Sequence, residues 1–456
     1  MLIQSSIYES YEATQNACKL CTPLGACLAF KGIRGGIPLL HGSQGCSTYI
    51  RRYLISHFRE PMDIACSNFA EETAIFGGGL NMKSALENIC KQYDPEFIGI
   101  ATTCLSETIG DNVPMFLRDF RSSHSDEDLP PLTHVSTPSY SGTHIDGFHG
   151  AVHAIVASMV VREEGRSNHL NLLPGMVSPA DLRYMKEILM DFGIPFVVLP
   201  DYSETLDGGP WDEYHRISEG GTPVEEIKRM GSAAATIEFG RILAEGDSTG
   251  LLLRQEYGVQ VYRLGLPIGI NETDRFFAAL QSVSGSSIPD KYIRERGRLI
   301  DSYIDGHKIV AGATAAIYGE EDLVVGLVSF LSEIGITPIL CASGGNSGSL
   351  KAKINEVNHN FIDQGGEVLS GVDFIDIAEA AVYLKPDILI GNSKGYFLAR
   401  QINVPLIRVG FPIHDRVGGG RIHHLGYRGA QELFDRIANT VLEKQQIDSG
   451  RGFSYM

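Results

Sequence analysis

Three cysteines in the first quarter of the chain lie where they can hold a metal cluster. Cys21 is followed at once by Thr-Pro-Leu-Gly, Cys46 ends the glycine-rich segment His41–Cys46, and Cys104 follows the apolar stretch Phe97–Thr102. Iron–sulfur clusters are held by thiolates, and neighbouring glycines let backbone N–H groups approach the sulfides closely. These three cysteines are therefore candidates to hold one iron–sulfur cluster. The alternative is buried free thiols, since free cysteine is among the most buried residue types.

The other cysteines give weaker signals. The chain has 8 cysteines, and all but one lie within the first 104 residues. Cys18 and Cys21 form a C-x-x-C pair, but no second such pair or histidine pair follows at the spacing of a zinc site. So few cysteines in 456 residues do not make a disulfide scaffold, and in a reducing compartment they would be thiols, ligands or core fillers. The role of Cys18 stays open, whereas a buried core position suits Cys27, Cys66, Cys90 and Cys341.

Other catalytic motifs are weak or absent in the sequence. Glycine clusters occur at 76–80, 342–349 and 417–421, but none has the dinucleotide fingerprint or the lysine of a phosphate-binding loop. We interpret them as tight turns. There is no G-x-S-x-G motif, and a hydrolase built on His41 and Ser43 would need a partner base that the sequence does not place.

Short apolar strands and amphipathic helices alternate along the chain. Strands are predicted at 97–102, 169–173, 195–200, 250–253 and 337–342, and helices at 180–192, 222–235, 272–284 and 321–334. This alternation predicts an α/β fold class with three Rossmann-like αβα domains and mostly parallel sheets. Cys104 would lie at the carboxyl edge of such a sheet, where ligands gather. We place a cluster-binding domain at 1–165, a second domain at 166–300, and a third at 301–456 with a C-terminal helix.

Composition limits the partners. The length of 456 residues suggests about three domains. A net charge of −17 disfavours nucleic acid or an anionic membrane as the main partner. No apolar run approaches the ~20 residues that span a bilayer, and the first ten residues lack a signal-peptide pattern. We therefore predict a cytoplasmic protein with no nucleic-acid or membrane partner.

Around these cysteines the sequence resembles the β-type subunits of the nitrogenase component 1 family. The resemblance runs from residue 17 to about 440, and it is dense in the first 145 residues. The matching stretches are 21–26 (CTPLGA), 41–61 (HGSQGCSTYIRRYLISHFREP), 76–79 (FGGG), 102–111 (TTCLSETIGD), 136–144 (STPSYSGTH), 296–301 (RGRLID), 386–393 (PDILIGNS), 409–416 (VGFPIHDR) and 425–430 (LGYRGA).

The resemblance implies roles for particular residues. Cys21, Cys46 and Cys104 match the β-side ligands of the P-cluster, an 8Fe–7S cluster shared with the α-type subunit. Ser139 matches a serine whose oxygen can join that cluster on oxidation. Tyr49 matches an aromatic residue between the cluster and the partner's cofactor. Hydrogen bonds from the loop that contains Ser43 would tune the cluster potential.

The resemblance also implies partners. They are an α-type subunit in an α₂β₂ heterotetramer, which holds its own iron–sulfur active-site cofactor, and an ATP-dependent iron protein that docks at Phe76. Glu60, Asp301 and Asp305 match carboxylates that hold a cation between two β subunits. Asp301 and Asp305 are one helical turn apart, although a solvated acidic face is the alternative interpretation.

The departures from the family pattern bear on which member this is. Only 20 residues precede the first ligand, fewer than in β subunits with a long N-terminal extension. All four cluster residues are retained, which favours an electron-relay subunit without catalytic residues of its own. We expect the β-type subunit of a nitrogenase-like reductase, such as a methylthio-alkane reductase. The alternatives are an N-type scaffold for assembly of the iron–molybdenum cofactor, a β subunit of a dinitrogen-reducing nitrogenase, and, more weakly, a tetrapyrrole reductase.

Overall fold

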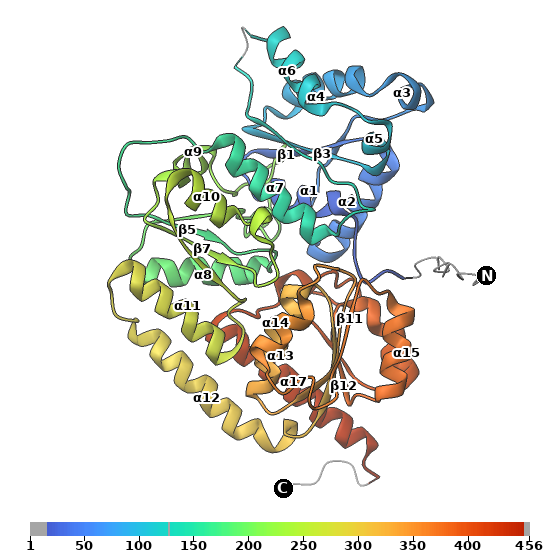
Figure 1. Ribbon diagram of the computed structural model, residues 1–456, viewed down its shortest axis with the longest axis vertical. Helices are drawn as coiled ribbons and strands as arrows, with labels where there is room; N and C mark the ends of the chain where they lie inside the picture. Colours follow the sequence, from blue (N-terminus) through green and yellow to red (C-terminus); the bar gives the residue numbers. More distant parts are fainter. Residues whose placement is uncertain (1–15, 126–127, 451–456) are drawn as a thin grey trace, which may run out of the picture.

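The computed structural model describes residues 16–125 and 128–450. Three parallel sheets are each covered by helices, and they stack from the top to the bottom of Figure 1. The predicted fold class is confirmed. Among the described residues, no helix is both long and apolar enough to cross a membrane.

The first sheet, at the top of Figure 1, has the strand order β2-β1-β3-β4 and is entirely parallel. Its two central strands, β1 and β3, are buried along their whole length. The strands are β1 (Gly36–His41), β2 (Ala65–Cys66), β3 (Phe97–Thr102) and β4 (Leu132–Val135). The helices are α1 (Thr22–Lys31), α2 (Gln44–Phe58), α3 (Glu71–Phe76), α4 (Gly79–Tyr93), α5 (Cys104–Ile109), α6 (Val113–Ser123) and α7 (His144–Met159).

The second sheet has the order β6-β5-β7-β8 and is also parallel. Its strands are β5 (Leu170–Leu173), β6 (Phe196–Val198), β7 (Ala235–Phe239) and β8 (Gln260–Leu264). Its helices are α8 (Pro179–Asp191), α9 (Val224–Lys228), α10 (Thr249–Tyr257) and α11 (Gly269–Ser284).

The third sheet has the order β11-β10-β9-β12-β13, with every pair parallel. The long helix α12 (Asp290–Val310) packs beside the final helix α17 (Gly426–Asp448), where Arg428 reaches Glu295 at 3.0 Å. The strands are β9 (Thr314–Tyr318), β10 (Thr337–Ser343), β11 (Glu367–Ser370), β12 (Ile388–Gly391) and β13 (Leu406–Arg408). The remaining helices are α13 (Glu321–Glu333), α14 (Leu350–Val357), α15 (Phe374–Leu384) and α16 (Tyr396–Ile402).

Two local predictions were wrong. Gly250–Leu253 is not a strand but part of α10, which begins where Ser248 Oγ accepts the Leu251 N–H at 3.0 Å. A run of four apolar residues does not distinguish a buried strand from a helix, and here the serine cap decides. The helix predicted over 222–235 is also shorter, with α9 ending at Lys228 before a 3₁₀ turn. Helix α12 spans the proposed boundary at 300/301, and the division into three domains stays a prediction.

Helices α1 and α7 cross in close backbone contact. All ten residues of α1 are buried. A Cβ on Gly25 would lie 1.7 Å from the His144 carbonyl oxygen, and one on Gly147 would lie 1.8 Å from the Thr22 carbonyl oxygen. Only glycine permits this approach at either position. The contact fixes the start of α1, and therefore Cys21, beside the segment that leads into α7.

We predict that Gly147→Ala destabilises the chain, because its methyl group would force the two helices apart. Overpacking of this kind costs about 1–3 kcal/mol of unfolding free energy. Gly209→Ala is the matched control, since nothing lies within 4 Å of that position. Urea unfolding of the two variants checks this, and equal midpoints would contradict the close contact.

Candidate functional site

The three candidate thiols come from three loops at one edge of the first sheet. Strand β1 pairs with β3 so that His41 lies opposite Thr102, and both strands end there. Cys46 lies in the first turn of α2, after β1, and Cys104 is the first residue of α5, after β3. Cys21 caps the N-terminus of α1.

The fold brings these thiols close enough to influence one another. Burial and the charges of Cys21 and Cys104 raise the pKa of the Cys46 thiol. Cys21 and Cys46 are nevertheless exposed at the surface, and Cys104 is half-buried. This exposure is unusual for cysteine and leaves a group of thiols open on one side.

Ser139 lies between two of the cysteine loops. Its backbone N–H donates to Cys104 Sγ at 3.3 Å, and its Oγ accepts the Thr22 N–H, one residue after Cys21, at 3.2 Å. The close packing of α1 against α7 makes this bridge between distant segments. The structure therefore brings together Cys21, Cys46, Cys104 and Ser139.

The donor set suits a cluster with several iron atoms. Thiolates are soft ligands that select iron–sulfur clusters, and an N–H bond to a sulfur stabilises its charged form. In the part of the chain that the structure describes, no three histidine, cysteine or acidic side chains converge on a single metal ion. The open side leaves room for ligands from a partner.

Polar contacts hold the Cys104 helix against the segment before Ser139. Glu107 accepts hydrogen bonds from the hydroxyls of Thr102 and Ser136. The Thr137 N–H donates to Thr102 Oγ1 at 2.8 Å. Sequence analysis did not single out these residues, although polar side chains directly after a buried strand are a usable signal.

Cys18, Cys27 and Cys341 are buried away from this group, whereas Cys66 is near enough for its charge to raise the pKa of Cys46. Cys27 and Cys341 are buried, and burial raises the pKa of each thiol. Burial also raises the pKa of Cys18 to about 12, so it is a protonated core thiol at neutral pH. Cys66 is half-buried, and its Sγ donates to the Gly42 carbonyl at 3.3 Å.

Two predicted residues of the α2 region have distinct surroundings. Ser43 caps α2, where its Oγ accepts the Gly45 N–H at 3.4 Å. Tyr49 lies one turn after Cys46 and is 60% exposed. Its ring lies 5.6 Å from that of Tyr53, which in turn lies 5.2 Å from His414. An aromatic series therefore begins on the exposed face beside the thiols.

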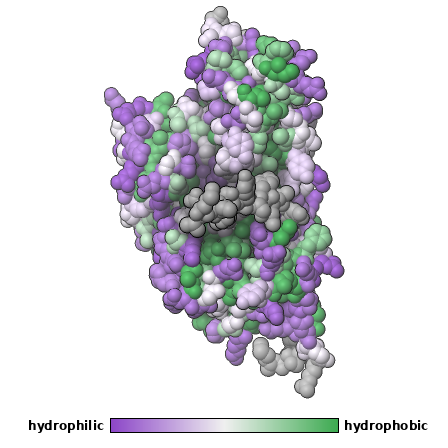
Figure 2. Space-filling view, turned by 45° about the vertical axis from the view of Figure 1, so that its right-hand side comes forward, coloured by the Kyte–Doolittle hydropathy of each residue, from purple (hydrophilic) through white to green (hydrophobic). Residues whose placement is uncertain are grey.

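An apolar surface lies at the predicted docking residue. Phe76 is 85% exposed, and Ile75 and Leu80 are also exposed. With Met115 and Phe116, Phe76 and Leu80 line a groove of about 810 Å³. Figure 2 shows hydrophobic side chains near the top of the molecule, the end with the first sheet. Exposed apolar patches of this kind occur at interaction surfaces and binding grooves, and docking at Phe76 stays a prediction.

The three predicted cation ligands do not meet within this chain. Glu60 lies near Asp207 and Arg421, and burial, then Asp207, raises its pKa. Asp301 and Asp305 are exposed on α12. No recorded contact in the described residues joins Glu60 to either aspartate, so a cation site between two copies stays a prediction.

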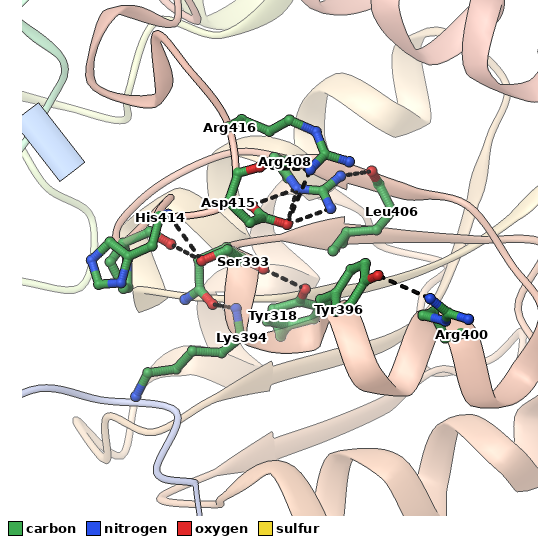
Figure 3. A network of polar contacts seen from close by, with 12 residues as sticks. Tyr318, Ser393, Lys394, Tyr396, Arg400, Leu406, Arg408, His414, Asp415 and Arg416 are labelled. Carbon is green, nitrogen blue, oxygen red and sulfur yellow. Dashed lines mark hydrogen bonds and ion pairs between the residues drawn. The ribbon is translucent and has the colours of Figure 1, made fainter. Parts of the chain in front are cut away.

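The third domain makes hydrogen bonds to α2 and to the segment that precedes Cys21. Ile413 N–H donates to His57 Nδ1 on α2 at 2.9 Å, and His414 Nε2 lies 3.2 Å from the Tyr53 carbonyl. Lys394 donates to the carbonyl of Ala17, four residues before Cys21, at 2.6 Å. Figure 3 shows the network behind these contacts, in which Arg408 pairs with Asp415, and Ser393 accepts the His414 N–H.

The fold and site define a three-sheet α/β protein with an open thiol site, and known proteins share this plan. The family model for nitrogenase component 1 type oxidoreductases matches residues 21–442. The nitrogenase molybdenum-iron protein beta chain of Clostridium pasteurianum is 36% identical over 94% of this chain and 93% of its own. The cofactor biosynthesis protein NifN of a Nostoc species is 32% identical over 94% of each chain.

A solved structure agrees. "Nitrogenase Cp1 at pH 6.5" superposes with a TM-score of 0.94 at 34% identity, over 99% of this chain and 98% of that one. The chain therefore belongs to the nitrogenase component 1 family of oxidoreductases. The predicted family and the predicted oxidoreductase class are confirmed.

Replacing Cys104 tests the ligand assignment. We expect Cys104→Ala to lower the iron content and the activity of the purified complex together, because the cluster loses a thiolate. Cys90→Ala, on α4, is the control and should retain its iron. Iron quantitation decides the matter, and unchanged iron in Cys104→Ala would contradict the assignment.

Acid should destabilise the contact between the third domain and α2 at His57, and so lower the unfolding free energy. Burial, then the charge of His414, lowers the pKa of His57 to about 3, and the rings of Phe58 and Phe411 cover it. The unfolded chain binds this proton below about pH 6.5, so unfolding free energy falls as pH drops from about 6.5 toward 3. The slope is up to about 1.4 kcal/mol per pH unit.

Urea unfolding at pH 7 and pH 5 measures this slope. His57→Gln should reduce the pH dependence without abolishing it, because His57 no longer titrates whereas His134, whose pKa burial lowers to about 4, still does. His215→Gln, at an exposed histidine, should leave it as in the native chain. A native slope in His57→Gln would contradict the prediction.

Proposed function

We propose that this chain is the P-cluster-bearing electron-relay β-type subunit of a component 1 reductase. The observation that carries the proposal is the group formed by Cys21, Cys46, Cys104 and Ser139 at one open edge of the first sheet. The family membership supports it. A cytoplasmic location belongs to the same proposal, since a reducing compartment keeps cysteines as thiols.

The residues of this chain would hold and tune the cluster. Cys21, Cys46 and Cys104 would be its thiolate ligands, and Ser139 would supply an oxygen beside Cys104. When bound, the cluster supplies sites that accept and release electrons. The Ser139 N–H donates a hydrogen bond to Cys104 Sγ and helps to hold that side chain in place. The buried strands β1 and β3 fix the loops, so the ligands need little rearrangement to bind.

The partners follow from the same surfaces. The open side of the thiol group would meet an α-type subunit in an α₂β₂ heterotetramer, which holds the active-site cofactor. Tyr49, exposed beside the thiols, would lie toward that cofactor. The groove at Phe76 would receive an ATP-dependent iron protein. Glu60, Asp301 and Asp305 would hold a cation between two copies of this chain.

The proposed substrate of the complex is a methylthio-alkane. A nitrogenase-like reductase that cleaves the C–S bond of methylthio-alkanes fits the complete set of cluster residues. The beta-chain relatives support a dinitrogen-reducing subunit as well. The second candidate is an assembly scaffold, which the 32% identity to NifN favours.

Spectroscopy and turnover of the purified complex separate these functions. We expect an eight-iron cluster in each pair of α-type and β-type subunits, with an EPR signal on oxidation and turnover that requires the iron protein. Methanethiol release from a methylthio-alkane, against ammonia from dinitrogen, identifies the substrate. A four-iron cluster without turnover would overturn the relay and favour the scaffold.

A further inference from the structure

A buried histidine–carboxylate pair lies between the docking surface and the thiol group. His41, the last residue of β1, is fully buried, and its Nε2 lies 2.9 Å from Asp111 Oδ2. The Asp111 side chain is only 4% exposed. Such a pair, hydrogen-bonded and away from water, keeps one geometry and moves as a unit.

On one side the pair contacts the docking loop. Asp111 Oδ1 accepts the Gly78 N–H at 2.9 Å, two residues after the exposed Phe76. A Cβ on Gly78 would lie 2.6 Å from Asp111 Oδ2 and 2.7 Å from His41 Cε1. Gly78 is therefore pressed against both members of the pair, and a displacement of this loop must move them.

On the other side the pair contacts both thiol loops. The His41 carbonyl accepts hydrogen bonds from Thr103 N–H at 3.1 Å and Thr103 Oγ1 at 3.3 Å, directly before Cys104. Asp111 N–H donates to the Ser106 carbonyl at 3.1 Å, which ties it to the helix that begins at Cys104. The residue after His41 starts the loop to Cys46.

The packing around the pair leaves little room to absorb a movement. The Phe69 ring lies 4.8 Å from the His41 ring and the Phe116 ring lies 6.2 Å away, both edge-on. A Cβ on Gly42 would lie 1.9 Å from Thr103 Oγ1. Close-packed interiors transmit strain instead of absorbing it. Displacement at the docking loop should therefore reach the thiols.

We propose that His41 and Asp111 are positioning residues that transmit docking of the iron protein at Phe76 to the cluster ligands Cys46 and Cys104. The inference rests on the proposed function and adds to it a route by which docking changes the cluster environment. Neither residue touches the cluster or gains an electron. Each acts through the loops it joins, so docking sets the geometry of the thiols before an electron leaves.

Asp111→Ala in the full complex tests the route. We expect native iron content and a nearly native KM for the iron protein, because ligands and docking surface are intact. The change in the cluster EPR signal on docking should be lost, and electron transfer from the cluster should slow about fivefold or more. Native spectra and rates in the docked complex would overturn the proposal.

Three further variants separate the route from folding and charge. Asp111→Asn keeps the size, its Oδ1 can still accept the Gly78 N–H, and its NH2 group can donate to His41 Nε2 in the other tautomer, so it should restore most of the docking response. Gly78→Ala places a methyl group against Asp111 and His41 from the docking loop, and it should reproduce the loss of the docking response. Glu256→Ala removes a charge from an exposed position on α10, outside the Phe76 groove, and should behave as the native chain. A loss in Glu256→Ala equal to that in Asp111→Ala would assign the effect to charge alone.

The native complex distinguishes failure of this inference from failure of the proposed function. If it lacks an eight-iron cluster, the proposed function fails. If it has the cluster and its EPR signal changes on docking, but Asp111→Ala and Gly78→Ala keep the native docking response, only the route through His41 fails. If Asp111→Ala folds poorly, the docking responses of Gly78→Ala and Asp111→Asn are compared instead, and a native response in Gly78→Ala would overturn the route.

Discussion

The parallel pairing of β1 with β3 is the constraint on which the site depends. Their residues pair in register from Gly36 with Phe97 to His41 with Thr102, and both strands are buried on both faces. A slip of one residue would reverse every side chain in a fully packed core. Because the register cannot drift, the loops to Cys46 and Cys104 leave the sheet at the same edge, side by side.

The cysteine side chains of this protein lie in two different environments, and their proposed roles differ accordingly. Cys27 and Cys341 lie in the apolar interior, where burial keeps the thiol protonated. Cys21 and Cys46 lie at the surface on loops rich in backbone donors. An exposed group of thiols is a reactive liability in a free chain, so its presence agrees with a site completed by another subunit.

How far the sequence predicts this protein depends on the range of the contacts involved. Strand β3 and the helix predicted at 321–334 follow from local apolar patterns, and α10 does not, because four apolar residues suit either state. The cysteine loops were recognisable from their turns and glycines. The role of Ser139 came from the family resemblance alone, because residues 117 apart, such as Thr22 and Ser139, meet only in the folded chain.

The sequence by itself determined the α/β class, the family and the candidate ligands, since these depend on residue types and short-range patterns. Only the tertiary structure placed Cys21 and Cys104 near Cys46, joined His41 to Asp111, and set the third domain against α2. The physical reason is that such contacts arise when distant segments pack closely. Glycines at 25, 78 and 147 permit that packing, and a glycine in a sequence does not say which neighbour it will meet.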